Sequence, residues 1–246
     1  MNWHEVADRV YRFATRWVNF YVVIDDDRAL LIDAGYPGHW KPLLAALDAI
    51  GVPGRSIDVI VTHHHVDHTG TAQRLTAERN ASVFVHEVDA AAVRGERRSR
   101  VPPGFYRQAW RASMMRYLGH TVRVGGARYR PVPEAQPLQV GVRPELAGAP
   151  TVIYTPGHTA GHCSILLADR GVLFTGDAMV AFDYATGKRG LSLHRFNEDR
   201  EQALTSLEAL ERTNATLVLF GHGEPWTGSL DHALATVRRD AQGNRR

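Results

Sequence analysis

One six-residue segment constrains this chain more than any other feature. Residues 57–61 are rich in β-branched side chains and predict a buried strand, which runs directly into His63-His64-His65-Val66-Asp67-His68. In extended backbone, alternate side chains point to opposite sides, so His63 and His65 share one side and His64 faces the other. Two imidazoles placed in this way can hold one metal ion. Asp67 and His68 follow the bend and can reach an adjacent ion.

Three later turns place further ligand side chains after predicted strands. They are Pro156-Gly157-His158, Thr175-Gly176-Asp177 and Gly221-His222-Gly223, and in each a glycine lets the backbone turn sharply. Each turn alone is ordinary, but together with the histidine segment they indicate one shared site. The single cysteine, Cys163, excludes an internal disulfide and a site of several thiolates. Imidazole and carboxylate ligands suit zinc, and also iron or manganese.

The order of predicted elements favours an α/β fold. Both halves of the chain alternate strands with helices, which predicts a four-layer αβ/βα sandwich with two facing mixed β-sheets flanked by helices, in one domain spanning residues 1–246. The predicted strands are 10–18, 20–25, 29–33, 57–61, 82–85, 151–154, 164–167, 172–174 and 216–220, and the predicted helices are 40–50, 198–211 (with Asn197 as N-cap) and 229–239, with one more ending near residue 78.

Residues 87–150 differ from both halves because prolines interrupt them repeatedly. Only residues 105–118 are predicted to be helical there. We interpret this stretch as a variable excursion that shapes a substrate pocket. Residues 94–130 contain ten arginines and one acid, Glu96, a pattern that would attract an anionic substrate or nucleic acid, or would form a solvated helical face. No basic strand interleaved with aromatics indicates base stacking, so nucleic acid is the disfavoured partner.

Composition places the chain among ordinary globular proteins. Of its 246 residues, 44% are hydrophobic and 22% charged, and the formal net charge is +3. No apolar run approaches the roughly 18–20 residues of a membrane span, and Glu5 and Asp8 interrupt the opening residues where a signal peptide would be apolar. We therefore expect a cytoplasmic protein that does not act at a membrane. Its partner would be a small-molecule substrate, and homo-oligomerisation is left open.

The metal-ligand pattern resembles the metallo-β-lactamase superfamily. His63, His65, Asp67 and His68 reproduce its His-x-His-x-Asp-His motif without a change, and Leu31-Ile32-Asp33-Ala34-Gly35 matches its first motif. The likeness runs from residue 33 to residue 222 and is nearest to glyoxalase II-like thioesterases and lactonases. It implies that His63, His65 and His158 bind a first metal, that Asp67, His68 and His222 bind a second, and that Asp177 bridges them. Asp33 would support the metal loop from behind.

The resemblance and the charges together predict a metal-dependent hydrolase. Two zinc ions, or iron or manganese, would supply a bridging hydroxide that attacks a small ester, lactone or thioester. Asp67 is the predicted catalytic residue, because it can orient the attacking water or accept its proton. Tyr184 and His194, in the loop after Asp177, are candidate substrate-pocket residues. His162 is expected to form hydrogen bonds and not to bind metal.

Several other functions are compatible with the same ligands, because one fold hosts many reactions. A β-lactamase or a phosphodiesterase or nuclease would use the same metal site. Class B β-lactamases, however, usually carry Cys or Ser at the position of Asp177, and 246 residues leave little room for the long insertion of the RNA-processing members. An iron-dependent sulfur dioxygenase or redox protein is an alternative of another class, and a metal-binding protein without catalysis is a third.

Overall fold

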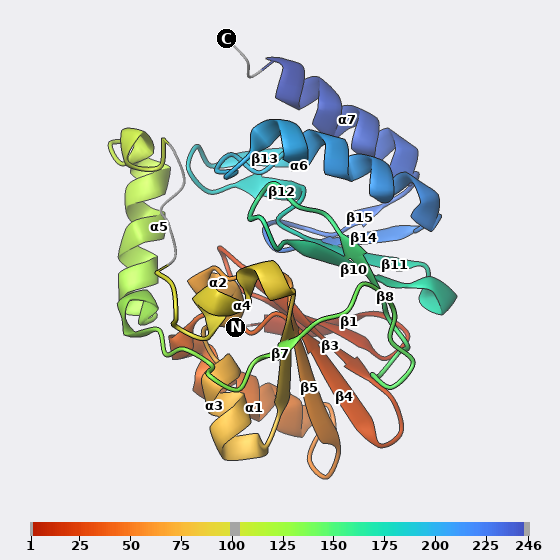
Figure 1. The fold of residues 1–246 in the computed structure, drawn as a ribbon. Coiled ribbons are helices and arrows are strands. Elements are labelled where there is room, and N and C mark those ends of the chain that lie inside the picture. The colour runs from red at the N-terminus through yellow and green to blue at the C-terminus, as the bar shows by residue number, and fades with distance from the viewer. Residues whose placement is uncertain (1, 99–103, 244–246) are drawn as a thin grey trace.

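Two mixed β-sheets face each other, and helices cover the outer face of each sheet (Figure 1). The computed structural model describes residues 2–98 and 104–243, so Arg100, Pro102 and Pro103, which belong to the predicted excursion, lie outside the described residues. The arrangement of helices and sheets is the predicted four-layer α/β sandwich.

The first sheet joins an antiparallel meander to a parallel half. Strands β2, β3 and β4 pair antiparallel, and β4, β5 and β6 pair parallel, with Ile32 opposite Ile60. An edge strand, β1, was not predicted because its side chains are largely exposed and show no buried apolar face. The strands in spatial order are β1 (Asn2–Ala7), β2 (Val10–Ala14), β3 (Asn19–Ile24), β4 (Arg28–Ile32), β5 (Ser56–Val61), β6 (Ser82–Val85) and β7 (Gln136–Pro137).

The second sheet is antiparallel except where β11 pairs parallel with β14. A separate hairpin, which was not predicted, follows β11 and consists of β12 (Val180–Asp183) and β13 (Lys188–Ser192). The sheet strands in spatial order are β15 (Trp226–Thr227), β14 (Leu217–Phe220), β11 (Val172–Gly176), β10 (Cys163–Leu167), β9 (Thr151–Tyr154) and β8 (Gly141–Val142).

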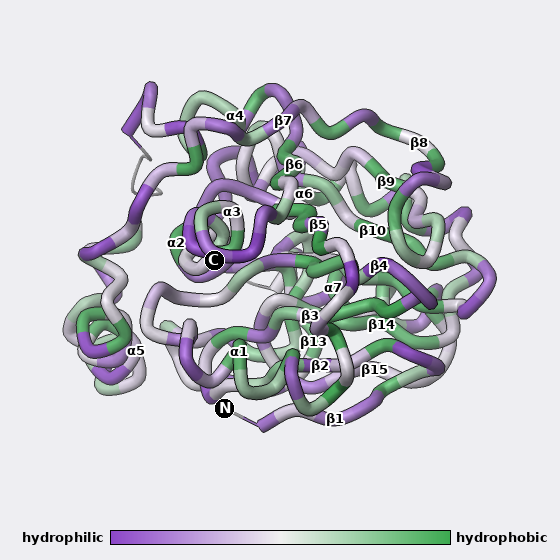
Figure 2. The backbone as a smooth tube through the Cα atoms, turned by 90° about the horizontal axis from the view of Figure 1, so that it is seen from below, coloured by the Kyte–Doolittle hydropathy of each residue, from purple (hydrophilic) through white to green (hydrophobic). Residues whose placement is uncertain are grey.

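Alternation along the strands fixes the layers. In β3, Phe20 and Val22 pack against the helices on the outer face of the first sheet, α1 (Trp40–Ala49) and α3 (Ala72–Arg79), whereas Tyr21 and Val23 pack between the two sheets. The hydrophobic segments in Figure 2 accordingly run through β3, β4 and β5 in the interior. The outer helices are α1 (Trp40–Ala49) and α3 (Ala72–Arg79) on the first sheet, and α6 (Arg200–Ser206) and α7 (Leu230–Gly243) on the second. None of the helices in the described residues is long and apolar enough to span a membrane.

The excursion differs from its prediction in two helices. The helix predicted at residues 105–118 is confirmed over residues 112–118 but begins later and ends later: a short 3-10 turn at Tyr106–Gln108 precedes α5, which spans Ala112–Arg123. The extended backbone of Arg111 separates the two, and Met114, Tyr117 and Leu118 then share one helix face that packs inward. Helix α4 (Glu87–Val93) was not predicted. Figures 1 and 2 both place α5 at the periphery of the molecule.

The N-terminus of α6 also differs from expectation. Asp199 caps this helix by accepting a hydrogen bond from the Gln202 N–H at 2.9 Å. The predicted cap, Asn197, instead donates its side-chain amide to the His194 carbonyl at 2.7 Å. Asn197 therefore stabilises the loop before α6, and Asp199 caps the helix.

A buried carboxylate on α4, Asp89, ties this helix to two loops. Its Oδ2 accepts from Thr159 Oγ1 at 2.7 Å and from the His64 N–H at 3.1 Å, and its Oδ1 accepts from the Gly161 N–H at 3.1 Å. His64 Nδ1 also lies 3.0 Å from Oδ2. Burial raises the pKa of Asp89, but the contacts with His64 and Thr159 outweigh it and lower the pKa to about 2. Asp89 therefore joins the histidine segment after β5 to the loop after β9.

The Asp89→Asn variant should lower the free energy of unfolding at pH 7 by about 2–4 kcal/mol, because an amide nitrogen would face groups that donate to a carboxylate. The folded pKa of about 2 lies below the unfolded value of about 3.9. The wild-type protein should therefore keep this stabilisation above about pH 4 and lose it as the pH falls towards about 2, a loss that the variant lacks. Denaturant unfolding followed by circular dichroism measures both effects.

The matched control for this test is Glu87→Gln, since Glu87 is exposed on the same helix. It should change the unfolding free energy by less than about 0.5 kcal/mol. Equal stability of the two variants would contradict the role of Asp89.

Candidate metal centre

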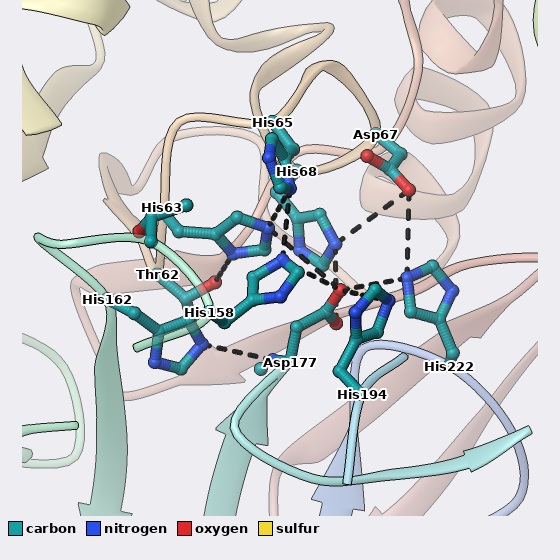
Figure 3. A network of polar contacts seen from close by, with 12 residues as sticks. Thr62, His63, His65, Asp67, His68, His158, His162, Asp177, His194 and His222 are labelled. Carbon is teal, nitrogen blue, oxygen red and sulfur yellow. Dashed lines mark hydrogen bonds and ion pairs between the residues drawn. The ribbon is translucent and has the colours of Figure 1, made fainter. Parts of the chain in front are cut away.

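Four loops bring the predicted ligands together at one end of the facing sheets (Figure 3). The histidine segment follows β5, and short turns after β9, β11 and β14 carry the other three side chains. All seven predicted metal ligands lie in this cluster: His63, His65, Asp67, His68, His158, Asp177 and His222. His194, which was predicted as a pocket residue, also forms a group with His158 and Asp177 that could hold a metal ion.

Three imidazoles form the first half of the cluster. His65 Nδ1 lies 3.0 Å from His63 Nε2 and 3.0 Å from His158 Nε2. Burial and the neighbouring histidines hold the pKa of each ring well below its ordinary value, so the rings are neutral near pH 7. Neutral imidazoles gathered around one point are competent metal ligands.

The second half combines a carboxylate with two imidazoles. Asp67 Oδ2 lies 3.7 Å from His222 Nε2 and 3.9 Å from His68 Nε2. Helix α2 (Val66–Thr69) follows His65 immediately, which turns Asp67 and His68 out of the line of the strand. The bend therefore directs them to a second point beside the first.

Asp177 lies between the two halves. Its Oδ2 is 3.5 Å from His158 Nε2 and 3.1 Å from His222 Nε2, and its Oδ1 is 3.6 Å from His68 Nε2. Burial alone would raise the pKa of Asp177, but the surrounding imidazoles hold it well below its ordinary value. Gly221 packs against this carboxylate, and a Cβ at that position would collide with Asp177 Oδ1. The glycine thus keeps the centre of the cluster open.

Thr62 and Asp33 bind the Nδ1 atoms of His63 and His68, on the side of each ring that faces away from the cluster. Thr62 Oγ1 donates its only hydrogen to Asp33, at 2.9 Å, so it accepts from His63 Nδ1 at 3.0 Å. Asp33 Oδ2 also accepts from His68 Nδ1 at 2.7 Å. Both rings therefore carry a hydrogen on Nδ1 and turn Nε2 towards the cluster. Asp33 lies behind the histidine segment, and its support of a metal-binding loop stays a prediction.

The carbonyl oxygen of Trp17 orients His222. His222 Nδ1 donates to this oxygen, which directs Nε2 towards Asp177 Oδ2 at 3.1 Å. Burial lowers the pKa of His222, but Asp177 outweighs it and raises the pKa. Sequence reasoning found neither Thr62 nor Trp17. No motif identifies a backbone carbonyl, and Thr62 precedes the histidines without any ligand spacing of its own.

The donor set fits a pair of divalent cations. The Nε2 atoms of His63, His68 and His222 lie 3.1–4.0 Å from the carboxylate oxygens of Asp177, and the buried atoms His68 Nε2 and Asp177 Oδ1 have no hydrogen-bond partner. A buried carboxylate needs positive charge beside it, which protonated imidazoles supply until a metal cation replaces their protons. Burial lowers the pKa of His68, but Asp33, Asp177 and Asp67 outweigh it and raise the pKa to about 10. The space beside His68 therefore favours a positive charge.

Nearby residues outside the cluster have other partners. His162 Nε2 accepts from the Asp177 N–H at 3.0 Å, and its Nδ1 lies 2.9 Å from Thr155 Oγ1, so both nitrogens are engaged. His64 contacts Asp89 and belongs to none of the groups that could hold a metal. Cys163 is buried, which raises the pKa of its thiol to about 12 and keeps it protonated.

The two predicted pocket residues line a cavity of about 580 Å³ beside the cluster. His194 Nε2 lies 3.4 Å from Asp177 Oδ2, and the Tyr184 ring stacks on Tyr117 with a centroid distance of 4.0 Å. Asp67 and Asp177 also line this cavity, so a molecule inside it would reach the cluster directly. The Tyr117 hydroxyl, 3.4 Å from Asp67 Oδ2, is a further polar group beside the cluster.

Comparison with known proteins agrees with this geometry. The family profile described as metallo-beta-lactamase superfamily matches residues 16–222. The probable metallo-hydrolase YflN of Bacillus subtilis is 26% identical, with 91% of this chain and 87% of the relative covered. A hydroxyacylglutathione hydrolase of Fuscovulum blasticum is 30% identical over 88% of this chain and 67% of its own.

A solved structure gives the same result. The metallo-beta-lactamase family protein of Thermus thermophilus superposes with a TM-score of 0.61 at 26% identity, covering 92% of this chain and 72% of that one. The family profile spans well over half of the sequence. The chain therefore belongs to the metallo-beta-lactamase superfamily.

Proposed function

We propose that this protein is a dinuclear metal-dependent hydrolase that acts on a small ester, lactone or thioester. The observation that carries the proposal is the position of the Asp177 carboxylate between two sets of ligands, with the Nε2 atoms of His68, His158 and His222 within 3.6 Å of its oxygens. The hydrolase names of the relatives support it. The first set would be His63, His65 and His158, and the second Asp67, His68 and His222.

Two divalent ions held there would make a water molecule acidic enough to lose a proton near neutral pH and would polarise the bond under attack. The chain's own residues would do the positioning. Asp67 Oδ2 faces both the second set of ligands and the cavity, so it is placed to orient the attacking water and to accept its proton. The Tyr117 hydroxyl donates towards the same oxygen and would hold the carboxylate in this orientation.

His194 and Tyr184 would bind the substrate. His194 Nδ1 lies 3.1 Å from the Phe196 backbone nitrogen and 3.3 Å from the Phe196 carbonyl oxygen, and its Nε2 points to Asp177. In the tautomer that accepts from the Phe196 N–H, Nε2 carries the hydrogen and can donate to an oxygen of the substrate where negative charge develops. Tyr184 would form an adjoining part of the wall, with its ring against His194 and His222.

We take zinc as the cofactor, because neutral imidazoles and carboxylates in a closed cluster suit it, with iron and manganese as the alternatives. A small molecule is the proposed partner, since the cavity volume lies within the range of small-molecule sites. A sulfur dioxygenase or redox enzyme would require iron and would consume oxygen. Metal analysis together with oxygen-uptake measurements separates these classes.

A hydrolysis panel of lactones, thioesters, β-lactams and phosphodiesters, run on protein reconstituted with zinc, tests the proposal. We expect turnover of an ester, lactone or thioester that chelator abolishes and zinc restores. Asp177→Ala should remove about one of the two ions and lower turnover by at least about 100-fold, because the shared carboxylate is lost. Asp169→Ala, at an exposed site, is the control. Unchanged activity of the Asp177 variant, or oxygen-dependent turnover with a single iron, would overturn the proposal.

The Thr62 hydroxyl should matter for metal affinity although Thr62 binds no metal. Thr62→Val keeps the shape of the side chain but frees His63 Nδ1 and removes a donor to Asp33, so zinc affinity should fall about 10–100-fold. Thr62→Ser retains the hydroxyl and should bind zinc nearly as the wild type does. Competition with a chromophoric chelator measures both constants, and equal affinity of the Val and Ser variants would refute this role.

A further inference from the structure

The cavity beside the cluster has an aromatic wall. Beyond Asp67, Asp177 and His194, it is lined mainly by apolar and aromatic side chains from the excursion and from the segments around β12 and β13. Tyr117 and Leu118 come from α5, and Tyr184 stacks on Tyr117. The aromatic wall consists of Phe105, Tyr117, Leu118, Tyr129, Tyr184 and Phe196.

Two arginines line the same cavity at its solvent side. Arg97 and Arg98 follow α4, and both are exposed, which places them at the mouth. Among the described lining residues the carboxylates are Asp67 and Asp177, and both belong to the metal cluster. Two divalent ions and two guanidinium groups together outweigh these two negative charges. The loaded cavity would therefore be positive and would attract an anion.

These features divide the cavity into three parts with different chemistry. The cluster would hold a reacting carbonyl, the aromatic wall favours an apolar group, and the mouth favours a negative charge. A substrate without an apolar group would leave the wall in contact with water. A neutral substrate would leave Arg97 and Arg98 without a partner on the ligand.

We propose that the substrate is an amphipathic acyl compound that carries an apolar group along the aromatic wall and an anionic group, such as a carboxylate, sulfonate or phosphate, at Arg97 and Arg98. This inference rests on the proposed hydrolase function and narrows its substrate class. It assigns Arg97 and Arg98, two residues of the arginine-rich stretch, to recognition of a small anion.

Binding of inert thioethers tests the inference without turnover. The probes are 2-(octylthio)ethanesulfonate and its neutral counterpart S-octyl-N-acetylcysteamine, and a shorter S-ethyl pair removes most of the apolar surface. Sulfonate is chosen because it is a weak metal ligand, so that its binding reports on the arginines. On the zinc-loaded protein, isothermal titration calorimetry should show the octyl sulfonate binding at least about fivefold more tightly than the neutral octyl probe.

The arginine variant should remove this preference. Arg97→Ala combined with Arg98→Ala should weaken the octyl sulfonate about fivefold or more and leave the neutral octyl probe nearly unchanged. The matched control combines Arg212→Ala with Arg239→Ala, two exposed arginines that do not line the cavity, and should keep the preference. A preference for the sulfonate that survives in the Arg97/Arg98 variant, or its absence in the wild type, would overturn the assignment of the anion site.

A second pair of variants tests the aromatic wall. Leu118→Asn should weaken both octyl probes about tenfold and affect the ethyl probes little, because it removes apolar contact along the wall. Met115→Asn, on the same helix but 55% exposed and outside the cavity, is the control. Equal binding of octyl and ethyl probes to the wild type would overturn the apolar part of the inference.

The octanoyl thioesters of 2-mercaptoethanesulfonate and N-acetylcysteamine separate this inference from the proposed function. Zinc-dependent hydrolysis of both thioesters with equal kcat/KM would contradict the anion site but leave the hydrolase. Selective binding of the sulfonate thioether without hydrolysis of any ester, lactone or thioester would contradict the hydrolase but leave the amphipathic cavity. Preferential hydrolysis of the sulfonate thioester, lost in the Arg97/Arg98 variant, would support both.

Discussion

The site depends on the electrostatic conflict around Asp177. This buried carboxylate faces the Nε2 atoms of His68 and His222, and it raises the pKa of both rings although burial lowers them. The carboxylate is costly to bury unless positive charge lies beside it, either as protons on these rings or as a bound cation. The cluster is therefore one in which the folded protein and a bound cation stabilise each other, and a change that relaxes the conflict should weaken metal binding even when no ligand is removed.

The fold places this conflict where loops from both sheets meet. The strand ends fix where each loop begins, and the hydrogen bonds behind the loops fix where each side chain points. Asp33 and Thr62 hold the histidines that follow β5, while Asp89 joins that loop to the one that carries His158. Since the supporting residues are themselves buried, the ligands are held with little freedom to rearrange. The peripheral α5 supplies part of the cavity wall without carrying any ligand of the cluster.

Sequence reasoning predicted the parts that follow from local pattern. The order of predicted strands and helices led to the sandwich of two sheets. The histidine segment after residues 57–61, the three later turns and the family resemblance led to seven side chains that the structure brings together. It missed Asp89 because the bonds to Thr159 and Gly161 join residues about 70 positions apart. It placed a helix at 105–118 because apolar residues there have helical spacing, whereas the extended backbone of Arg111 starts the helix later. Contacts between distant loops leave no periodic trace in one sequence.

We infer that the two halves of the cluster each hold a divalent ion and share Asp177. Anomalous diffraction at the zinc absorption edge, on crystals grown with excess zinc, would show this. We expect one peak among His63, His65 and His158, a second among Asp67, His68 and His222, and the Asp177 carboxylate in contact with both. A map without peaks at these positions, or a single peak with Asp177 turned away from it, would rule out the shared dinuclear site.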